Sequence, residues 1–259
     1  MKLKFLFSLL FPFILFSCVK TDIIPTKDYS APKIHLKGNN PMIVTLNTIF
    51  TDPGATATDN VDGTRNLSDK IIVTHNIPID GPSNGSGLTN TTGSYIISYS
   101  VTDKAGNTTT NNRTIIIKNS AEKYAVQYLF SKTGGQIFPN FNNELTVIDY
   151  DQNINNRIHF TEICNQSGFI VFADIIGDTT IDIPDQGVIL NQNGIDNLYR
   201  IYGIAGQSII SDSTILTLTI EYNLEKYYEA SVIDYDFYFG NRYWKNMAFS
   251  VNTEYYERL

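Results

Sequence analysis

The feature of this sequence that most limits its fold is a series of short segments in which apolar and polar residues alternate. The clearest runs from Tyr95 to Thr102, where aromatic or aliphatic side chains fall at every second position. A period of two is that of a β-strand with one buried face. Asn-, Gly- and Pro-rich stretches separate similar segments at residues 33–36, 42–46, 71–74 and 113–117. The segment 32–119 is therefore expected to be a β-sandwich of two antiparallel sheets.

The alternation continues in residues 122–259, which also hold 13 of the 16 tyrosines and the only tryptophan. Strands are expected at residues 124–130, 145–148, 158–161, 169–175, 181–183, 198–202, 216–222 and 235–239. These segments suit either a single antiparallel barrel or a second sandwich. The whole chain is therefore expected to be all-β, with two domains.

The first twenty residues, MKLKFLFSLLFPFILFSCVK, predict a secretory signal peptide at residues 1–17. Lys2 and Lys4 precede an apolar run from Phe5 to Phe16, which is too short to cross a bilayer as a helix. A lone cysteine, Cys18, follows a small residue at the end of that run. This arrangement resembles the lipobox of bacterial lipoproteins, which implies that Cys18 is lipidated and becomes the mature N-terminus. The alternative is an ordinary signal peptide whose cleavage site lies beside a cysteine.

Lipidation of Cys18 would place the protein on the outer membrane, facing either the cell exterior or the periplasm. Residues 18–31 are then a charged, proline-containing spacer. The formal net charge of −7 becomes −9 without Lys2 and Lys4, and such a chain repels nucleic acid. Cys164 would be the only remaining thiol, so no disulfide within the mature chain is expected.

Four blocks in the first domain share their order with a known family. They are PKIHL at Pro32–Leu36, DPGATATDNVDG at Asp52–Gly63, GSYIISYSVTDKAGN at Gly93–Asn107 and RTIII at Arg113–Ile117. Together they resemble the bacterial Ig-like domain of pesticidal crystal proteins. The resemblance implies a sandwich that acts as a spacer or adhesion element and has no catalytic residues. The insert at residues 78–92 is expected to be a polar loop outside the core.

The acidic residues of these blocks have two interpretations. Pro53 and Gly54 predict a type II turn, and nearby aspartates can accept backbone hydrogen bonds in turns. The alternative is a calcium site, which needs six to eight oxygen ligands, and Val61 departs from the EF-hand pattern. The structural interpretation is favoured, so no metal or other cofactor is expected. The residues concerned are Asp52, Asp59, Asp62 and Asp103.

The sequence predicts no enzyme. The chain has only three histidines and neither a zinc-protease motif nor a nucleophile elbow. His159 and Cys164 would lie on opposite faces of a continuous strand, and Cys164 is expected to be a small core residue. Asp234 and Asp236 would lie about 7 Å apart on one face, a separation found in inverting glycosidases. Apolar neighbours claim the inner face of that strand, so both acids are expected to face water.

The second domain resembles, in three short stretches, the small β-barrel domain at the C-terminus of surface lipoproteins of glycan-degrading Gram-negative bacteria. The stretches are IDIPDQ at Ile181–Gln186, IYGIAGQ at Ile201–Gln207 and LTLTIEY at Leu216–Tyr222. Exposed aromatic rings beside amides and a guanidinium suit sugar binding. The candidate ligand-binding residues are Tyr238, Arg242, Tyr243 and Trp244. A polysaccharide ligand is therefore expected. The alternative is a structural or adhesion subunit that binds a protein partner in an envelope complex.

Overall fold

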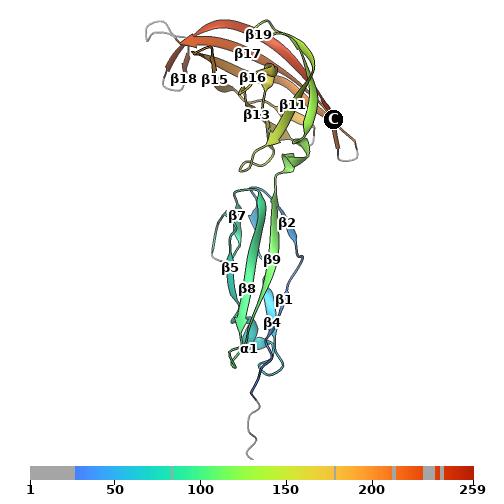
Figure 1. Ribbon diagram of the computed structural model, residues 1–259, viewed down its shortest axis with the longest axis vertical. Helices are drawn as coiled ribbons and strands as arrows, with labels where there is room; N and C mark the ends of the chain where they lie inside the picture. The colour runs from blue at the N-terminus through green and yellow to red at the C-terminus, as the bar shows by residue number, and fades with distance from the viewer. Residues whose placement is uncertain (1–26, 83, 178, 212–213, 230–236, 240–241) are drawn as a thin grey trace, which may run out of the picture.

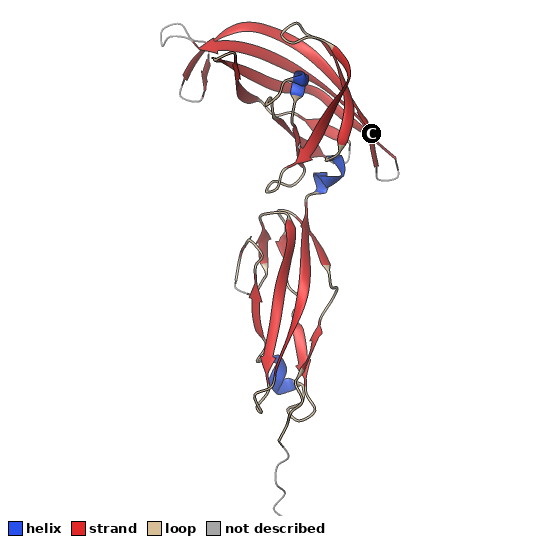
Figure 2. Cartoon of the chain, viewed as in Figure 1, coloured by secondary structure: helices blue, strands red, loops and turns tan. Residues whose placement is uncertain are grey.

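The computed structural model describes residues 27–82, 84–177, 179–211, 214–229, 237–239 and 242–259. Most of the described chain is strand, and the regular helical segments are three short ones (Figure 2). The expected all-β fold is therefore confirmed. Cys18, Asp234 and Asp236 lie outside the described residues, as do the expected signal peptide and most of the spacer. Among the described residues, no helix is long and apolar enough to cross a lipid bilayer.

The first domain is an Ig-like sandwich. One sheet has the order β2-β9-β8-β5, in which β2 runs parallel to β9. The opposite layer consists of the pair β1-β4 and the sheet β3-β7-β6. The elements are β1 (Lys33–Leu36), β2 (Met42–Thr45), β3 (Ile49–Phe50), β4 (Ala55–Thr58), α1 (Arg65–Ser68), β5 (Ile72–His75), β6 (Ile79–Asp80), β7 (Gly87–Thr89), β8 (Gly93–Thr102) and β9 (Thr108–Lys118).

The core of the sandwich contains a fully buried cation that the apolar pattern did not predict. Ile97, Tyr99 and Ile115 supply the apolar part of this core. Arg113, between them, has no exposed surface. Its Nε lies 3.3 Å from Asp52 Oδ1 and donates to the Tyr99 hydroxyl at 3.1 Å. Its other guanidinium nitrogens donate to backbone carbonyls, so the buried charge is paired and hydrogen-bonded, as burial of a charge requires.

The expectation of a purely polar loop at residues 78–92 is wrong. Strands β6 and β7 lie within this segment and complete the sheet with β3. Thr89 is fully buried, because its hydroxyl donates to Thr45 O and Thr48 O at 3.0 and 3.1 Å. A buried hydroxyl costs little when it is hydrogen-bonded in this way. The polar composition of this segment therefore did not reveal that Thr89 is buried and links two turns of the sandwich.

The second domain is a closed antiparallel barrel, which decides between the two architectures left open by the sequence. Eight strands follow the ring β10-β11-β12-β13-β14-β16-β17-β19, and β10 pairs again with β19 to close it. β15 and β18 extend the sheet beyond the ring. The strands are β10 (Gln127–Gly134), β11 (Phe141–Tyr150), β12 (Arg157–Phe160), β13 (Val171–Ile176), β14 (Thr180–Asp182), β15 (Gln186–Gln192), β16 (Ile195–Ser211), β17 (Thr214–Glu229), β18 (Phe237–Phe239) and β19 (Arg242–Arg258).

The narrowest join of the ring lies between β14 and β16, where a single residue pair is in register. β16 has a bulge between Gly203 and Ala205. A Cβ added at Gly206 would lie 2.3 Å from Ile181 O, so only glycine lets the two backbones approach at this point. Gly203 N also donates to Ile183 O at 2.8 Å. The glycines therefore allow the long strand β16 to bend and complete the barrel.

The described part of the barrel interior is mostly apolar but encloses the carboxylate of Glu254. Glu254 is fully buried and lies opposite Lys132 in the register of β19 with β10. Its Oε1 accepts from the Tyr222 hydroxyl and from Cys164 N, both at 2.7 Å, and its Oε2 accepts from the Tyr256 hydroxyl. Burial raises the pKa of Glu254 above its ordinary value of 4.5, although these hydrogen bonds favour the charged form.

Glu254 should make the stability of the barrel depend on pH. Because its pKa is raised on folding, the folded state holds its proton more tightly than the unfolded state. The contribution of Glu254 to the free energy of unfolding is then present below about pH 4.5 and is lost as pH rises through the pKa of the folded state. Glu254→Gln keeps the hydrogen-bonding shape without the charge, so we expect it to gain stability relative to wild type as pH rises. Urea titrations at pH 4.5 and 7.5 measure this, and a stability difference that does not change with pH would contradict it.

The two domains meet in a joint formed by the loop at residues 151–156 of the barrel, seated on the end of the sandwich (Figure 1). Asn47 Nδ2 donates to Asn153 O at 3.0 Å, and Asn155 N donates to Asn47 Oδ1 at 2.7 Å. Thr92 N donates to Gln152 O at 2.9 Å. These hydrogen bonds join uncharged amide and backbone groups, so screening by salt does not weaken the joint.

A buried amide completes the joint. Asn119 is the one residue between β9 and the short helix η1 (Ser120–Tyr124), and it is 3% exposed. Its Nδ2 donates to Asp151 O and Ile154 O at 2.7 and 2.8 Å. Its Oδ1 accepts from Ala121 N and Asn156 N, both at 2.9 Å. All four hydrogen-bonding positions of the amide are therefore used, which fixes the barrel relative to the sandwich.

Removal of the Asn47 side chain should loosen the joint without unfolding either domain. Asn47 has a φ of 58°, so Asn47→Gly avoids the backbone strain that alanine would add. We expect hydrogen exchange of the Asn155 amide to rise about fivefold, because a hydrogen bond of roughly 1 kcal/mol is lost. Asn143→Gly, at an exposed position with a φ of 55°, is the matched control and should leave that amide unchanged. Equal exchange in all three proteins would show that the joint does not depend on Asn47.

Candidate functional site

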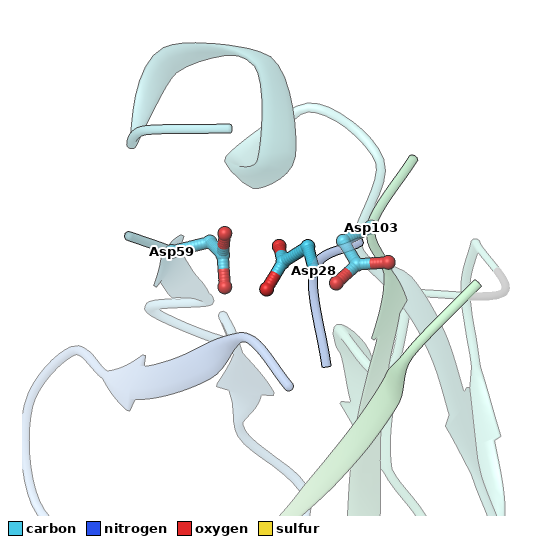
Figure 3. Close-up of side chains that lie close together, drawn as sticks. All are labelled: Asp28, Asp59 and Asp103. Carbon is cyan, nitrogen blue, oxygen red and sulfur yellow. The ribbon is translucent and has the colours of Figure 1, made fainter. Parts of the chain in front are cut away.

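The four aspartates of the alternative calcium site do not gather at one place. Asp59 and Asp103 lie together, and Asp28 from the end of the expected spacer lies between them (Figure 3). One carboxylate oxygen of each lies within 4.8 Å of one from the other two. The spacer residue is therefore part of the sandwich end, since Asn107 Nδ2 also donates to Asp28 O at 3.3 Å.

The three carboxylates are used by local turns. Asp59 Oδ2 accepts from Val61 N at 2.9 Å, and Asp103 Oδ1 accepts from Asn107 N at 2.7 Å. Burial raises the pKa of Asp103, but hydrogen bonds from the Asn107 side chain and from the turn backbone outweigh it, so the pKa is lowered. The turn-capping interpretation is confirmed for both residues. One oxygen from each of three carboxylates also supplies only three of the six to eight that calcium takes.

Asp52 and Asp62 each have a cationic partner elsewhere. Asp52 pairs with buried Arg113 and accepts from the Tyr99 hydroxyl at 2.6 Å. Asp62 lies 3.2 Å from Lys104 Nζ, and a hydrogen bond from Lys104 N lowers its pKa. Gly54 has the positive φ, 74°, that its turn requires. These aspartates therefore stabilise the sandwich.

His159 and Cys164 do not form a thiol–imidazole pair, but the reason differs from the prediction. The strand expected to contain both ends at Phe160, and Cys164 lies in the short helix η2 (Ile163–Asn165). His159 Nε2 lies 3.3 Å from Asp151 Oδ2. Cys164 is 1% exposed among core residues, as predicted, and burial raises the pKa of its thiol well above the ordinary value. A buried, protonated thiol is a poor nucleophile.

The candidate aromatic residues lie in the hairpin formed by β18 and β19. Tyr238 is opposite Tyr243 in register, Arg242 is opposite Phe239, and Trp244 is opposite Phe237. The hairpin therefore brings the four residues together along the backbone. Their side chains lie outside the described part of the chain, so their role in ligand binding stays a prediction.

The same strand, β19, carries exposed aromatic and aliphatic residues that the sequence reasoning missed. Phe249, Val251 and Tyr255 are 57%, 40% and 44% exposed on its outer side, while Ser250 and Asn252 between them are buried. β17 and β19 run along the side of the barrel domain farthest from the sandwich (Figure 1). We call the outer surface of β16, β17 and β19 the distal face, and define it by Tyr202, Gln207, Thr219, Glu221, Asn223, Phe249, Val251, Thr253 and Tyr255.

Strand register sets the arrangement of the distal face. Gln207, Thr219 and Tyr255 form one row across the three strands, and Asn223 and Val251 continue the row of Tyr202. Between these rows lies a shallow groove of about 250 Å³ lined by Ala205, Gly206, Gln207, Thr219, Glu221 and Thr253. Amide, hydroxyl and carboxylate groups thus line a depression, with exposed Tyr255 beside Thr219 in register and half-buried Tyr202 in the row on the other side.

Tyr202 is held at the edge of the distal face by a charged network. Arg200 forms a two-pronged hydrogen bond with Asp185, with its Nε 2.8 Å from Oδ1, and its Nη1 lies 3.4 Å from Glu225 Oε2. The Tyr202 hydroxyl donates to Glu225 Oε1 at 3.3 Å, and the Arg200 guanidinium lies 5.3 Å from the centre of its ring. Hydrogen bonding to Arg200 lowers the pKa of Asp185. The network fixes the orientation of the tyrosine ring.

This arrangement has the chemistry of a sugar-binding surface. Pyranose rings present apolar C–H faces that stack on aromatic rings, and their hydroxyls bond to amides and carboxylates. A signal for the distal face is present in the sequence, because Phe249, Val251 and Tyr255 are separated by even numbers of positions and so share one face of a strand. The usual assumption that apolar positions face the core would have placed these three side chains inside the barrel, whereas they are exposed.

Comparisons with known proteins place the first domain in a family. Residues 34–117 match the family described as "Bacterial surface protein, Ig-like domain". No curated protein matches the chain. A crystal structure of a lipoprotein from Bacteroides thetaiotaomicron is similar at 12% identity, over 88% of this chain and 100% of that one, with a TM-score of 0.29.

A second solved structure, a protein of unknown function from Bacteroides ovatus, is similar at 7% identity over 88% of this chain and 93% of that one, with a TM-score of 0.23. Both TM-scores are below 0.5, so neither similarity identifies a shared fold. The family match covers about a third of the chain and fits a protein of the bacterial cell envelope. Residues 34–117 are therefore a bacterial surface-protein Ig-like domain.

Proposed function

We propose that this protein is a non-enzymatic lipoprotein of the outer membrane, anchored through Cys18 and facing the cell exterior. In this proposal the Ig-like domain is a rigid stalk, as its resemblance to the pesticidal-crystal-protein type implies. The barrel domain binds polysaccharide through its distal face. The polar groove with exposed Tyr255 beside it, on a face that also exposes Phe249, is the observation that carries the proposal.

The arrangement of the domains supports the role of a stalk. The first described residues enter the sandwich at the end opposite to the barrel, and the distal face lies on the far side of the barrel (Figure 1). The hydrogen-bonded joint keeps these two ends apart. A lipid anchor before residue 27 would therefore leave the distal face directed away from the membrane.

Aromatic stacking on the distal face can be tested by affinity electrophoresis against a panel of soluble polysaccharides. We expect Phe249→Ala and Tyr255→Ala each to weaken retardation about fivefold, because each loses a stacking contact on the order of 1 kcal/mol. Leu145→Ala removes an exposed apolar side chain from β11 and should have no effect. Wild-type protein that is not retarded by any polysaccharide would refute the proposed ligand.

Lipidation can be tested independently of the ligand. We expect wild-type protein expressed with its own leader to incorporate labelled palmitate and to sediment with the outer membrane. Cys18→Ser should abolish both, because acylation needs the thiol and several acyl chains are required for stable anchoring. Palmitate incorporation that survives in Cys18→Ser would contradict the assignment of the anchor.

A second candidate function is that of an adhesion or structural subunit bound to a protein partner in the envelope. Exposed apolar side chains on β11, which is separated from β19 by β10, favour it, since Leu145 and Val147 are 58% and 45% exposed. Clustered exposed apolar residues are a feature of protein interfaces. A stoichiometric partner recovered by wild type but not by a Leu145→Ser, Val147→Ser variant would support this function over polysaccharide binding.

A further inference from the structure

The charges on and beside the distal face are unbalanced. The described ionisable side chains of this surface are one guanidinium, Arg200, and four carboxylates, Asp185, Glu221, Glu225 and Glu257. Their formal sum is −3 (+1 − 4). Arg200 is shared between Asp185 and Glu225, so it neutralises neither completely. The surface therefore presents a negative potential to any approaching ligand.

Glu221 places part of this charge inside the groove. It lies between Ala205 of β16 and Thr253 of β19 in register, and its side chain lines the groove. Among the residues that the structure describes, Glu221 has no ion-pair partner. Its neighbours in the groove are the uncharged Gln207 and Thr219. The carboxylate is thus available as a hydrogen-bond acceptor and uncompensated as a charge.

We infer that the distal face selects neutral glycans and rejects acidic ones, and that Glu221 makes the selection. This inference rests on the proposed function and names its ligand class. An ionised carboxylate accepts hydrogen bonds but cannot donate them. Sugar hydroxyls donate to it in charge-assisted hydrogen bonds, which are stronger than neutral ones. A uronate or sulfate group offers no donor and brings a second negative charge.

The shape of the groove strengthens this discrimination. Gln207, Thr219 and Thr253 supply both donors and acceptors, which suits hydroxyl groups. None of them carries the positive charge that an anionic sugar would need. Protein on both sides of the groove lowers the local dielectric, so repulsion there is less screened than on an open surface. Neutral sugars therefore stack on the aromatic rings and hydrogen-bond to the polar groups, whereas acidic sugars are repelled by the charge of Glu221.

The test compares one polymer in two charge states. A neutral polysaccharide that retards the wild-type protein is carboxymethylated, and both forms are used in affinity electrophoresis at low salt. We expect the carboxymethylated form to bind about tenfold more weakly, in line with repulsion between unit charges several ångströms apart. Added salt should strengthen binding of the charged form and leave that of the neutral form unchanged.

Glu221→Gln assigns the discrimination to one residue. This variant keeps the shape and the accepting oxygen of the side chain but lacks its charge. We therefore expect the affinity for the carboxymethylated polymer, divided by the affinity for the neutral polymer, to rise at least threefold. Glu144→Gln, the same change on exposed β11, is the control and should leave the ratio as in wild type. Matching thermal melting curves confirm that both variants fold.

The outcomes separate this inference from the proposed function. Equal binding of both polymer forms by wild type, or an unchanged ratio in Glu221→Gln, overturns the selection for neutral glycans and leaves polysaccharide binding standing. Stronger binding of the carboxymethylated form would also overturn it. Failure of every neutral and acidic polymer to retard the protein would instead refute the proposed function itself.

Discussion

The pairing of β10 with β19 is the interaction on which the second domain depends. It joins Tyr128–Gly134 to Arg258–Asn252 and turns an open sheet into a closed barrel. Without it, both strands would be unpaired edges and the apolar interior would face water on one side. The same pairing places Glu254 opposite Lys132 inside the barrel, and turns Phe249, Val251 and Tyr255 outward. The strand that closes the barrel is thus one of the three whose outer surfaces make the distal face.

Much of the fold could be predicted from alternation alone. Strand β8, whose buried positions Ile97, Tyr99 and Val101 are apolar, lies close to its expected place. The missed elements are those in which the buried side is polar or the strand is very short. β19 is the clearest case, because its buried side includes Ser250, Asn252 and Glu254. Three-dimensional pairing satisfies these polar groups, and no local pattern reveals such partners.

The candidate sites were predicted less well, for a related reason. Turn chemistry is local, so the roles of Asp59 and Asp103 could be predicted from their neighbours in sequence. The pairing of Asp52 with Arg113 joins residues far apart in the chain. The groove of the distal face is likewise assembled from three strands that only register brings together. A surface made in this way leaves no contiguous motif in the sequence.

Closure of the barrel also affects how the protein folds. The residues paired between β10 and β19 lie 118 to 130 positions apart, whereas β8 and β9 of the sandwich are joined by a short turn. Contacts between distant segments form slowly, because the intervening chain must first be ordered. The sandwich can therefore mature while the barrel is still an open sheet with adhesive edges. During that interval the unpaired edges of β10 and β19 are the part of this protein most prone to aggregation.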